Sequence, residues 1–348
     1  MMKRLALAFS LTFLAAPGWA AGAVASEDTL YSIQVRAVPM TEKADGMATY
    51  RALRDKGYLT YTYKAEIDGK PWLRVAVGVF DGIDDAAVFG ESFSAKEKQD
   101  HFVAVAPVRV VAGDGGDFVV TPSALWTRAG GKAREVLAFD DPAPRGFAAP
   151  GGIRLKPSPD RKAVAFQYGA RVYAVGLGDE KANLLTGDRD GFSDEHKYGP
   201  TPYWSPSGRY VAFHDTVGPE FSTNLWVARA DGSELRSLVD NWVERRKAVN
   251  EYVSIRAVWE FIWHPSEDRI FFVHGYADST IHVGGPIRSV DMAGNVRTML
   301  DSDVLVGYWE LAGPLRIEDG YLHYRKVQYG DNYISRTYTD KRTPLSDL

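Results

Sequence analysis

The sequence contains no cysteine, and this absence excludes several kinds of chemistry. Without a thiol the chain can form no disulfide, no thiolate nucleophile and no zinc–thiolate site. A cysteine-free chain suits an oxidising compartment such as the bacterial periplasm, where a free thiol would be oxidised.

The sequence also lacks an excess of charge of either sign. It has 41 Lys and Arg residues against 45 Asp and Glu residues, a net charge of −4, and 45% of its residues are apolar. This is an ordinary globular balance, and it offers no basic surface of the kind that nucleic acid attracts. We therefore expect no nucleic-acid partner.

Catalytic signatures are missing as well. The sequence has no nucleophile elbow, no H-E-x-x-H pattern, no paired glutamate motif and no phosphate-binding loop. We predict no catalytic residue, no cofactor and no metal. Because many Asp and Glu residues are present, a hydrolase or lyase with dispersed catalytic groups remains the alternative.

Long apolar runs are absent except at the N-terminus. Lys3 and Arg4 precede the apolar stretch Leu5–Ala16, and small residues follow before Ser26. This pattern predicts a secretory signal peptide over residues 1–25, with a mature start at Ser26 or, as second choice, at Ala21. A membrane anchor is the alternative. No other run reaches about 18 residues, so we expect no stable membrane span after cleavage and a periplasmic location.

One pattern recurs three times in the second half of the chain: an aromatic or apolar entry, a Pro-containing turn and an apolar strand. The copies are LKPSPDRKAVAF from Leu155, YWSPSGRYVAF from Tyr203 and FIWHPSEDRIFF from Phe261. Pro fixes φ at the first central turn position, and Asp, Ser or Gly follow where the turn is tight. Each copy predicts a β-hairpin, and further strands follow from Arg171, Asn224 and Pro286.

This repeat resembles the TolB-type, WD40-like propeller repeat in its Ser-Pro-Asp-Gly, Ile-Ala-Phe and Leu-Trp-Val pattern. The resemblance covers residues 111–348 and implies an all-β propeller of about five blades, with weaker copies at Phe118–Phe139 and Val304–Gln328. Because an unpaired flat edge promotes aggregation, we expect Tyr333–Thr339 to pair as a strand near one terminus of the array. Such a propeller would present a rigid surface to an envelope protein.

Residues 26–110 predict a separate α+β unit. Alternating apolar residues from Tyr31 indicate a strand, and apolar residues every three positions in Thr41–Lys56 indicate a helix. Strands at Tyr58–Ile67 and Trp72–Val79, a helix at Ile83–Phe93 and a strand at Phe102–Pro107 complete a β-α-β-β-α-β order. This order predicts a small ferredoxin-like sheet with two helices on one face. The Gly-rich stretch Ala112–Asp117 is expected to link the two domains.

The segments YSIQVRAV and LRVAVGVF in this unit resemble the SPOR domain family, whose members bind septal peptidoglycan glycan strands stripped of stem peptides. Gln34 and Arg74 match the family's glutamine and arginine, while Gly78 and Phe80 match its Gly-x-Phe. Arg36 and Ala37 depart from it, and the second replaces a serine that often contacts the ligand. The resemblance implies peptidoglycan as the partner of the whole unit.

The expected glycan site is Gln34, Arg36, Trp72 and Arg74 on an open sheet face. Amide and guanidinium groups can hydrogen-bond sugar hydroxyls and acetamides, and an aromatic ring can stack on a sugar face. By the two-residue period, Gln34 and Arg36 should share one face. The alternatives are that these residues are only solvated or contact protein, and that Trp72 belongs to the helix-side core.

Two features of the propeller could suggest a metal. Asp188–His196 gathers four acidic side chains around Gly191, although its spacing differs from that of a calcium-binding EF-hand loop. His196, His214, His264, His274 and His282 lie scattered among the blades. A solvated acidic loop and local hydrogen bonding are the favoured interpretations of these two features.

Overall fold

The computed structural model describes residues 29–139, 153, 155–168, 171–187, 202–216, 223–241, 256–276, 283–303, 309–331 and 335–348. The predicted signal peptide, the acidic loop 188–196, the extension 217–222 and most of the insertions 241–252 and 277–285 lie outside these ranges. None of the helices in the described part of the chain has the length and apolar character needed to span a bilayer.

The N-terminal unit has the predicted element order. Its elements are β1 (Tyr31–Pro39), α1 (Lys43–Asp55), β2 (Thr60–Ile67), β3 (Lys70–Phe80), α2 (Ile83–Glu97) and β4 (Phe102–Val105), with a short 3-10 turn at Met40–Glu42. The strands form one antiparallel sheet in the order β2-β3-β1-β4. Ile33, Leu53, Val77 and Phe93 form the core between the sheet and the two helices. The alternation of apolar residues along each strand places this core on one face of the sheet.

In the described part of the chain, five small antiparallel sheets follow in chain order. Sheets of four strands are formed by β5–β8 (Arg109–Ala112, Gly116–Val120, Ala124–Ala129, Lys132–Ala138), β9–β12 (Lys156–Pro157, Ala163–Tyr168, Arg171–Gly176, Asn183–Leu184), β13–β16 (Tyr203–Trp204, Tyr210–Thr216, Thr223–Arg229, Arg236–Val239) and β17–β20 (Arg256–Trp263, Arg269–Tyr276, Ile287–Asp291, Val296–Leu300). The last sheet has three strands, β21 (Trp309–Glu318), β22 (Tyr321–Tyr329) and β23 (Arg336–Pro344). The strand positions predicted from the repeat are confirmed. The tail pairs with β22 as predicted, but its strand β23 runs to Pro344 and not to Thr339, and residues 333–334 lie outside the described ranges.

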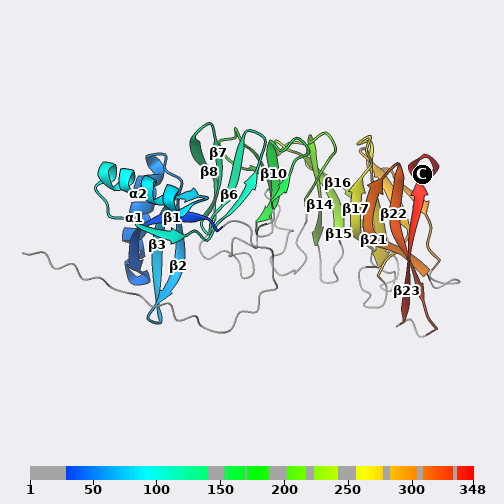
Figure 1. Cartoon of the computed structure of the whole chain (residues 1–348). Coiled ribbons are helices and arrows are strands. Elements are labelled where there is room, and N and C mark those ends of the chain that lie inside the picture. Colours follow the sequence, from blue (N-terminus) through cyan, green and yellow to red (C-terminus); the bar gives the residue numbers. More distant parts are fainter. Residues whose placement is uncertain are drawn as a thin grey trace, which may run out of the picture.

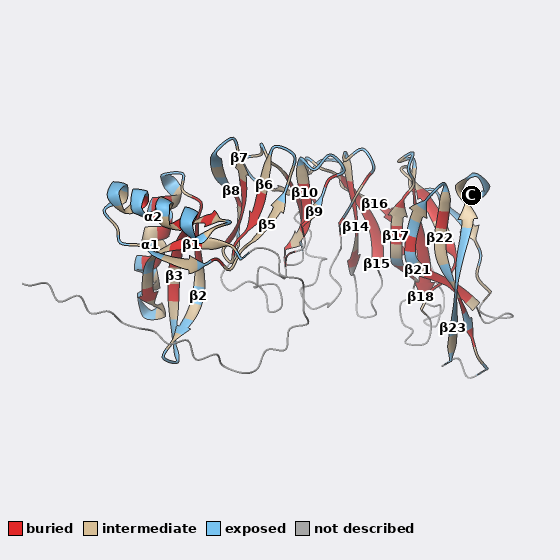
Figure 2. Ribbon diagram, in the orientation of Figure 1, coloured by how far each residue is buried: buried red, intermediate tan, exposed pale blue. Residues whose placement is uncertain are grey.

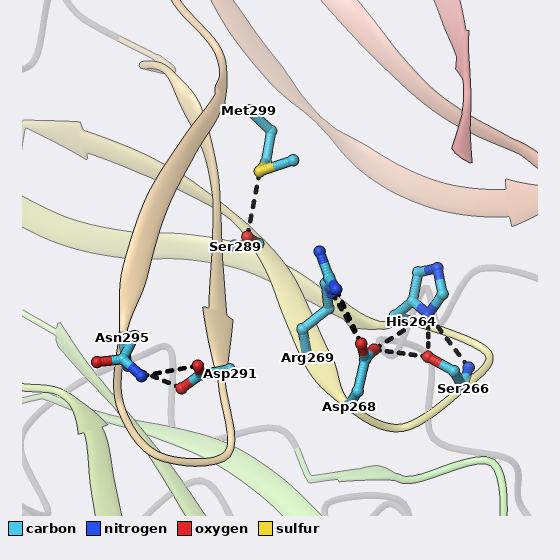
Figure 3. Close-up of polar contacts among 8 residues, drawn as sticks. All are labelled: His264, Ser266, Asp268, Arg269, Ser289, Asp291, Asn295 and Met299. Carbon is cyan, nitrogen blue, oxygen red and sulfur yellow. Dashed lines mark hydrogen bonds and ion pairs between the residues drawn. The ribbon is translucent and has the colours of Figure 1, made fainter. Parts of the chain in front are cut away.

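The three predicted hairpin turns share one backbone geometry. Ser158, Ser205 and His264 each close the turn by donating their N–H to the carbonyl five residues later. The residue three positions after each of them, Arg161, Gly208 or Glu267, has positive φ. In the third turn, His264 Nδ1 lies 2.5 Å from Ser266 Oγ, which donates to Asp268 at 2.5 Å (Figure 3). His264 therefore makes the local hydrogen bonds that were expected of it.

An indole hydrogen bond links the second and the third of these repeats to the preceding one. Trp204 Nε1 donates to the carbonyl oxygen of Lys156 at 2.7 Å, and Trp263 Nε1 donates to that of Tyr203 at 3.2 Å. Lys156 and Tyr203 occupy the same position in their own repeats, two residues before the turn serine. The aromatic entry of the repeat thus joins neighbouring sheets.

The sheets lie side by side in chain order, with the first and the last at opposite ends of the row (Figure 1). The first sheet is covered on both faces, one by the second sheet and the other by the N-terminal unit. Phe118 and Leu125 pack toward the second sheet, and Val119 and Trp126 pack against the N-terminal unit. The described strands therefore form an open row of blade-like sheets, and the face that ring closure would need is occupied.

The Gly-rich stretch 112–117 differs from its prediction as a linker. Ala112 pairs with Asp117, so the stretch is the hairpin turn between β5 and β6. The first sheet consequently begins at Arg109, only a few residues after β4. With so short a connection, the two parts of the chain pack directly on each other.

Candidate functional site

The sheet face opposite the helices carries three of the four predicted site residues. Ile33 and Val77 point to the helices, so the residues beside them in sequence point to the other face. Gln34 pairs with Ala76, and Arg74 pairs with Tyr63 on one side and Ala37 on the other. Trp72 lies two residues before Arg74 and shares its face. Gln34, Trp72 and Arg74 are thus brought to one surface, as predicted.

Arg36 does not join them, and the prediction that it shares a face with Gln34 is wrong. The register of β1 shifts between these residues: Gln34 lies opposite Ala76, but Arg36 lies opposite Val75. Adjacent residues of β3 point to opposite faces, so the two side chains of β1 do so as well. A β-bulge at Val35 breaks the two-residue period on which the prediction depended.

Part of the predicted open face is covered by the first sheet of the row. Tyr61 and Ala76 are fully buried and pack with Val119 and Trp126. The hydroxyl of Tyr61 donates to Ser32 Oγ at 2.9 Å within this contact. Ser123 Oγ also accepts a hydrogen bond from the backbone N–H of Thr62 at 3.1 Å. The region around Ser32 and Tyr61 is therefore an internal contact and is closed to a ligand.

The remaining part of the face combines a cation, an amide and aromatic rings. The guanidinium of Arg74 lies over the ring of Tyr63, 5.9 Å from its centroid. Arg74 Nε and Gln34 Oε1 are buried atoms that make no hydrogen bond to any residue the structure describes. Trp72 is half-buried on this face, away from the helix-side core. These groups leave hydrogen-bonding capacity beside rings on which a ligand can stack.

Tyr63 and Phe102 also belong to this surface, although the sequence pattern did not point to them. Phe102 lies directly opposite Gln34 on β4 and is 62% exposed. The sequence held one signal for Phe102, since an exposed aromatic residue in an otherwise apolar edge strand is unusual. The cross-strand partners of Gln34 and Arg74 could have been proposed only if the register had been known.

The arrangement has groups that can bind a ligand. It combines a guanidinium donor, an amide and aromatic rings. In the described ranges of the whole chain, no three His, Asp or Glu side chains gather closely enough to hold a metal ion. The acidic loop 188–196 lies outside those ranges.

A chain of buried polar side chains joins the third and fourth sheets of the row. Asp215 accepts hydrogen bonds from Trp226 Nε1 at 2.7 Å and from the N–H of Asn224 at 2.8 Å. The side-chain oxygen of Asn224 accepts from the N–H of Asn241 at 2.8 Å, and Asn241 Oδ1 lies 2.8 Å from His274 Nε2. All of these side chains are buried. Buried polar groups need such partners, so the chain acts as a structural junction.

Burial changes the acidity of both ends of this junction. It raises the pKa of Asp215 to about 6, an effect that the hydrogen bonds from Asn224 and Trp226 oppose. It lowers the pKa of His274 to about 3, and the charges of Arg288 and Arg256 lower it further. Both groups are consequently neutral in mildly acidic solution.

No protein-family model matches the sequence, and no curated protein matches it. Among solved structures, the chain is similar to TolB from Acinetobacter baumannii, with 12% identity over 90% of this chain and 64% of that one and a TM-score of 0.31. It is also similar to a TolB from Agrobacterium tumefaciens, with 17% identity over 58% of this chain and 85% of that one and a TM-score of 0.24. A structure from a study of two prolyl endopeptidases gives 13% identity over 88% of this chain and 46% of that one, with a TM-score of 0.41.

The chain thus spans about two thirds of the length of the first of these proteins and about half of the last. All three TM-scores are below 0.5, so these similarities identify neither a function nor a number of blades. The blade-like sheets are established by the strand pairing itself.

Proposed function

We propose that this protein is a cell-envelope protein whose N-terminal unit binds the glycan strands of peptidoglycan. The five-sheet row would offer a rigid surface to a protein partner in the periplasm. The strand order β2-β3-β1-β4, reached through β-α-β-β-α-β, supports the ferredoxin-like fold that the SPOR resemblance implies.

The observation that carries this proposal is the grouping of Gln34, Trp72 and Arg74 on the uncovered part of the sheet. Two of them keep buried polar atoms without a hydrogen-bond partner among the described residues. A glycan strand could satisfy these atoms with its hydroxyls and acetamides and could place a sugar ring on Trp72 or Phe102. Glycan strands stripped of stem peptides expose these groups most fully.

One observation favours a second candidate function. The first sheet of the row occupies the region around Tyr61 and Ala76, which a glycan would otherwise reach. The N-terminal unit could therefore serve as the cap of the row, with its remaining face contacting protein. A hydrolase or lyase is the third candidate, and it has no comparable support among the described side chains.

A sacculus-binding experiment tests the proposal. Arg74→Ala should weaken binding to purified sacculi by about ten- to hundredfold, because a hydrogen bond to a charged group contributes about 1.5–3 kcal/mol. Gln34→Ala should weaken it in the same direction. The melting temperature should hardly change, since both residues are only half-buried. Amidase treatment, which strips the stem peptides, should increase the binding of the wild type.

Arg36→Ala is the matched control, because it removes the same type of side chain from the other face of the sheet. It should bind sacculi as the wild type does. If Arg74→Ala and Arg36→Ala both bind stripped glycan as tightly as the wild type, the glycan site is wrong, and the N-terminal unit is better described as a cap.

A further inference from the structure

Among the residues that the structure describes, the last sheet of the row has no counterpart of the outer strand found in each of the other four row sheets. Its described strands are β21, β22 and β23, whereas every other sheet of the row has four. The missing position lies beside β23, which pairs with β22 along its whole length. Most of β23 is exposed, as Figure 2 shows at the end of the row.

The hydrogen bonds at the two ends of β23 reveal which backbone groups face outward. Gly330 donates its N–H to the carbonyl of Ser335, and Leu345 donates to that of Gly320. Opposed residues in an antiparallel pair alternate between hydrogen-bonded and non-hydrogen-bonded positions. The odd-numbered residues between Ser335 and Leu345 therefore bond to β22. Tyr338, Asp340 and Arg342 direct their N–H and C=O groups to the free edge.

The charge of this edge defines what could pair with it. β23 carries Arg336, Lys341 and Arg342 against the single acid Asp340. Arg342 is held over the ring of Tyr321, 4.6 Å from its centroid, so its position is fixed on the sheet. Tyr338 is 52% exposed and adds an aromatic surface in the middle of the strand.

We infer that β23 accepts an extended, acidic segment of a partner protein as the fourth strand of the last sheet. Main-chain hydrogen bonds to the free edge would provide affinity, and carboxylates opposite the basic side chains would provide specificity. A second copy of β23 has the same positive charge and is disfavoured as the occupant. This inference rests on the scaffold half of the proposed function, and it is independent of glycan binding.

A peptide-binding experiment tests the inference. The probe is a fluorescent nine-residue peptide of alternating Thr and Glu, and its matched control has Lys in place of Glu. In fluorescence anisotropy titrations at moderate salt, the wild type should bind the Glu peptide at least tenfold more tightly than the Lys peptide. A variant with both Lys341→Glu and Arg342→Glu should reverse this preference.

Two variants of one residue separate edge pairing from simple charge attraction. Tyr338→Pro removes an outward N–H and leaves the bonds to β22 in place, which edge strands tolerate. It should lose about tenfold or more in affinity for the Glu peptide, whereas Tyr338→Thr, which keeps the N–H, should stay within about threefold. If Tyr338→Pro fails to fold, the same loss is expected for wild-type protein with a Glu peptide N-methylated at alternate residues.

Three results would overturn the inference. The first is equal binding of the Glu and Lys peptides by the wild type. The second is that Tyr338→Pro binds the Glu peptide, or that the wild type binds the N-methylated Glu peptide, as tightly as the wild type binds the unmodified Glu peptide. The third is a wild-type dimer in sedimentation that Tyr338→Pro converts to a monomer, since a second copy would then be the occupant. Sacculus binding by the Tyr338 variants should match the wild type, so failure here leaves the glycan proposal unaffected.

Discussion

At the scale of single residues, the buried junction between the third and fourth sheets links stability to pH. The unfolded state binds a proton on His274 near pH 6.5, whereas the folded state does so only near pH 3. The stability due to neutral His274 is therefore complete above pH 6.5 and is lost as the pH falls. His214, whose pKa burial lowers to about 4, acts in the same sense.

Asp215 acts in the opposite sense over part of this range. Its folded-state pKa is about 6 and its unfolded value 3.8, so the folded state keeps a proton that the unfolded state releases between these values. Its contribution to stability rises as the pH falls from 6 to 4. Two histidines act against one aspartate, so acidification should destabilise the protein on balance.

We predict that His274→Gln flattens the pH dependence of stability between pH 7 and pH 5. Glutamine keeps an N–H donor for Asn241 and does not titrate. The slope of the unfolding free energy should decrease by about 1 kcal/mol per pH unit, measured by denaturant unfolding at several pH values. An unchanged slope in His274→Gln would show that this histidine is not held neutral.

At the scale of elements, the repeated turn shows why so much of the fold could be predicted. Turn chemistry and apolar alternation are local, so the three hairpins, the strands after them and the elements of the N-terminal unit could be assigned from sequence. Figure 3 shows how local the third turn is: its hydrogen bonds join residues that are close neighbours in sequence.

The parts that sequence did not predict depend on contacts between distant residues. A bulge at Val35 moves Arg36 off the candidate face, and no residue near it signals the shift. The packing of Trp126 on Tyr61 closes part of that face, and it joins segments that are separated by four other strands and a helix. The site could be predicted as a set of residue types on strands, but its extent could not.

We predict that Gly208→Ala destabilises the protein by about 1–2 kcal/mol. Gly208 has φ of 75°, a conformation that costs an L-residue about this amount. A methyl group there would meet no atom closer than 3.7 Å, so the loss would come from the backbone alone. The check is the urea midpoint at unchanged m-value.

Gly178→Ala is the control for this substitution. A Cβ at Gly178 would also meet free space, but Gly178 has no positive φ. It should leave the midpoint unchanged or raise it slightly. Equal stability of the two variants would mean that the left-handed turn residue contributes nothing specific to the hairpin.

At the scale of the whole molecule, the two ends of the row differ in kind. The first sheet is covered by the N-terminal unit through apolar contacts, while the last ends in the charged strand β23. An open array needs its terminal units protected, and these are two different ways of doing so. The N-terminal unit therefore has a structural role whether or not it also binds a glycan.

The open row predicts a distance between the first and the last sheet that a closed ring would not allow. Because the sequence has no cysteine, two introduced cysteines give a uniquely spin-labelled protein. Lys132 lies at the exposed start of β8 in the first sheet, and Lys341 is exposed on β23 in the last. Sheets pack about 10 Å apart, so four steps along the row give about 40 Å between the labels.

Double electron–electron resonance on the Lys132→Cys, Lys341→Cys variant should accordingly give a distribution centred near or above about 40 Å. In a closed ring the first and last sheets would be neighbours, and the distance would fall to about 10–20 Å, the spacing of adjacent sheets plus the label arms. Lys132→Cys paired with Lys181→Cys, which lies just before β12 of the second sheet, should give that short distance in either arrangement. If both label pairs gave the short distance, the row would close into a ring, and the N-terminal unit would have to leave the face of the first sheet that Trp126 occupies.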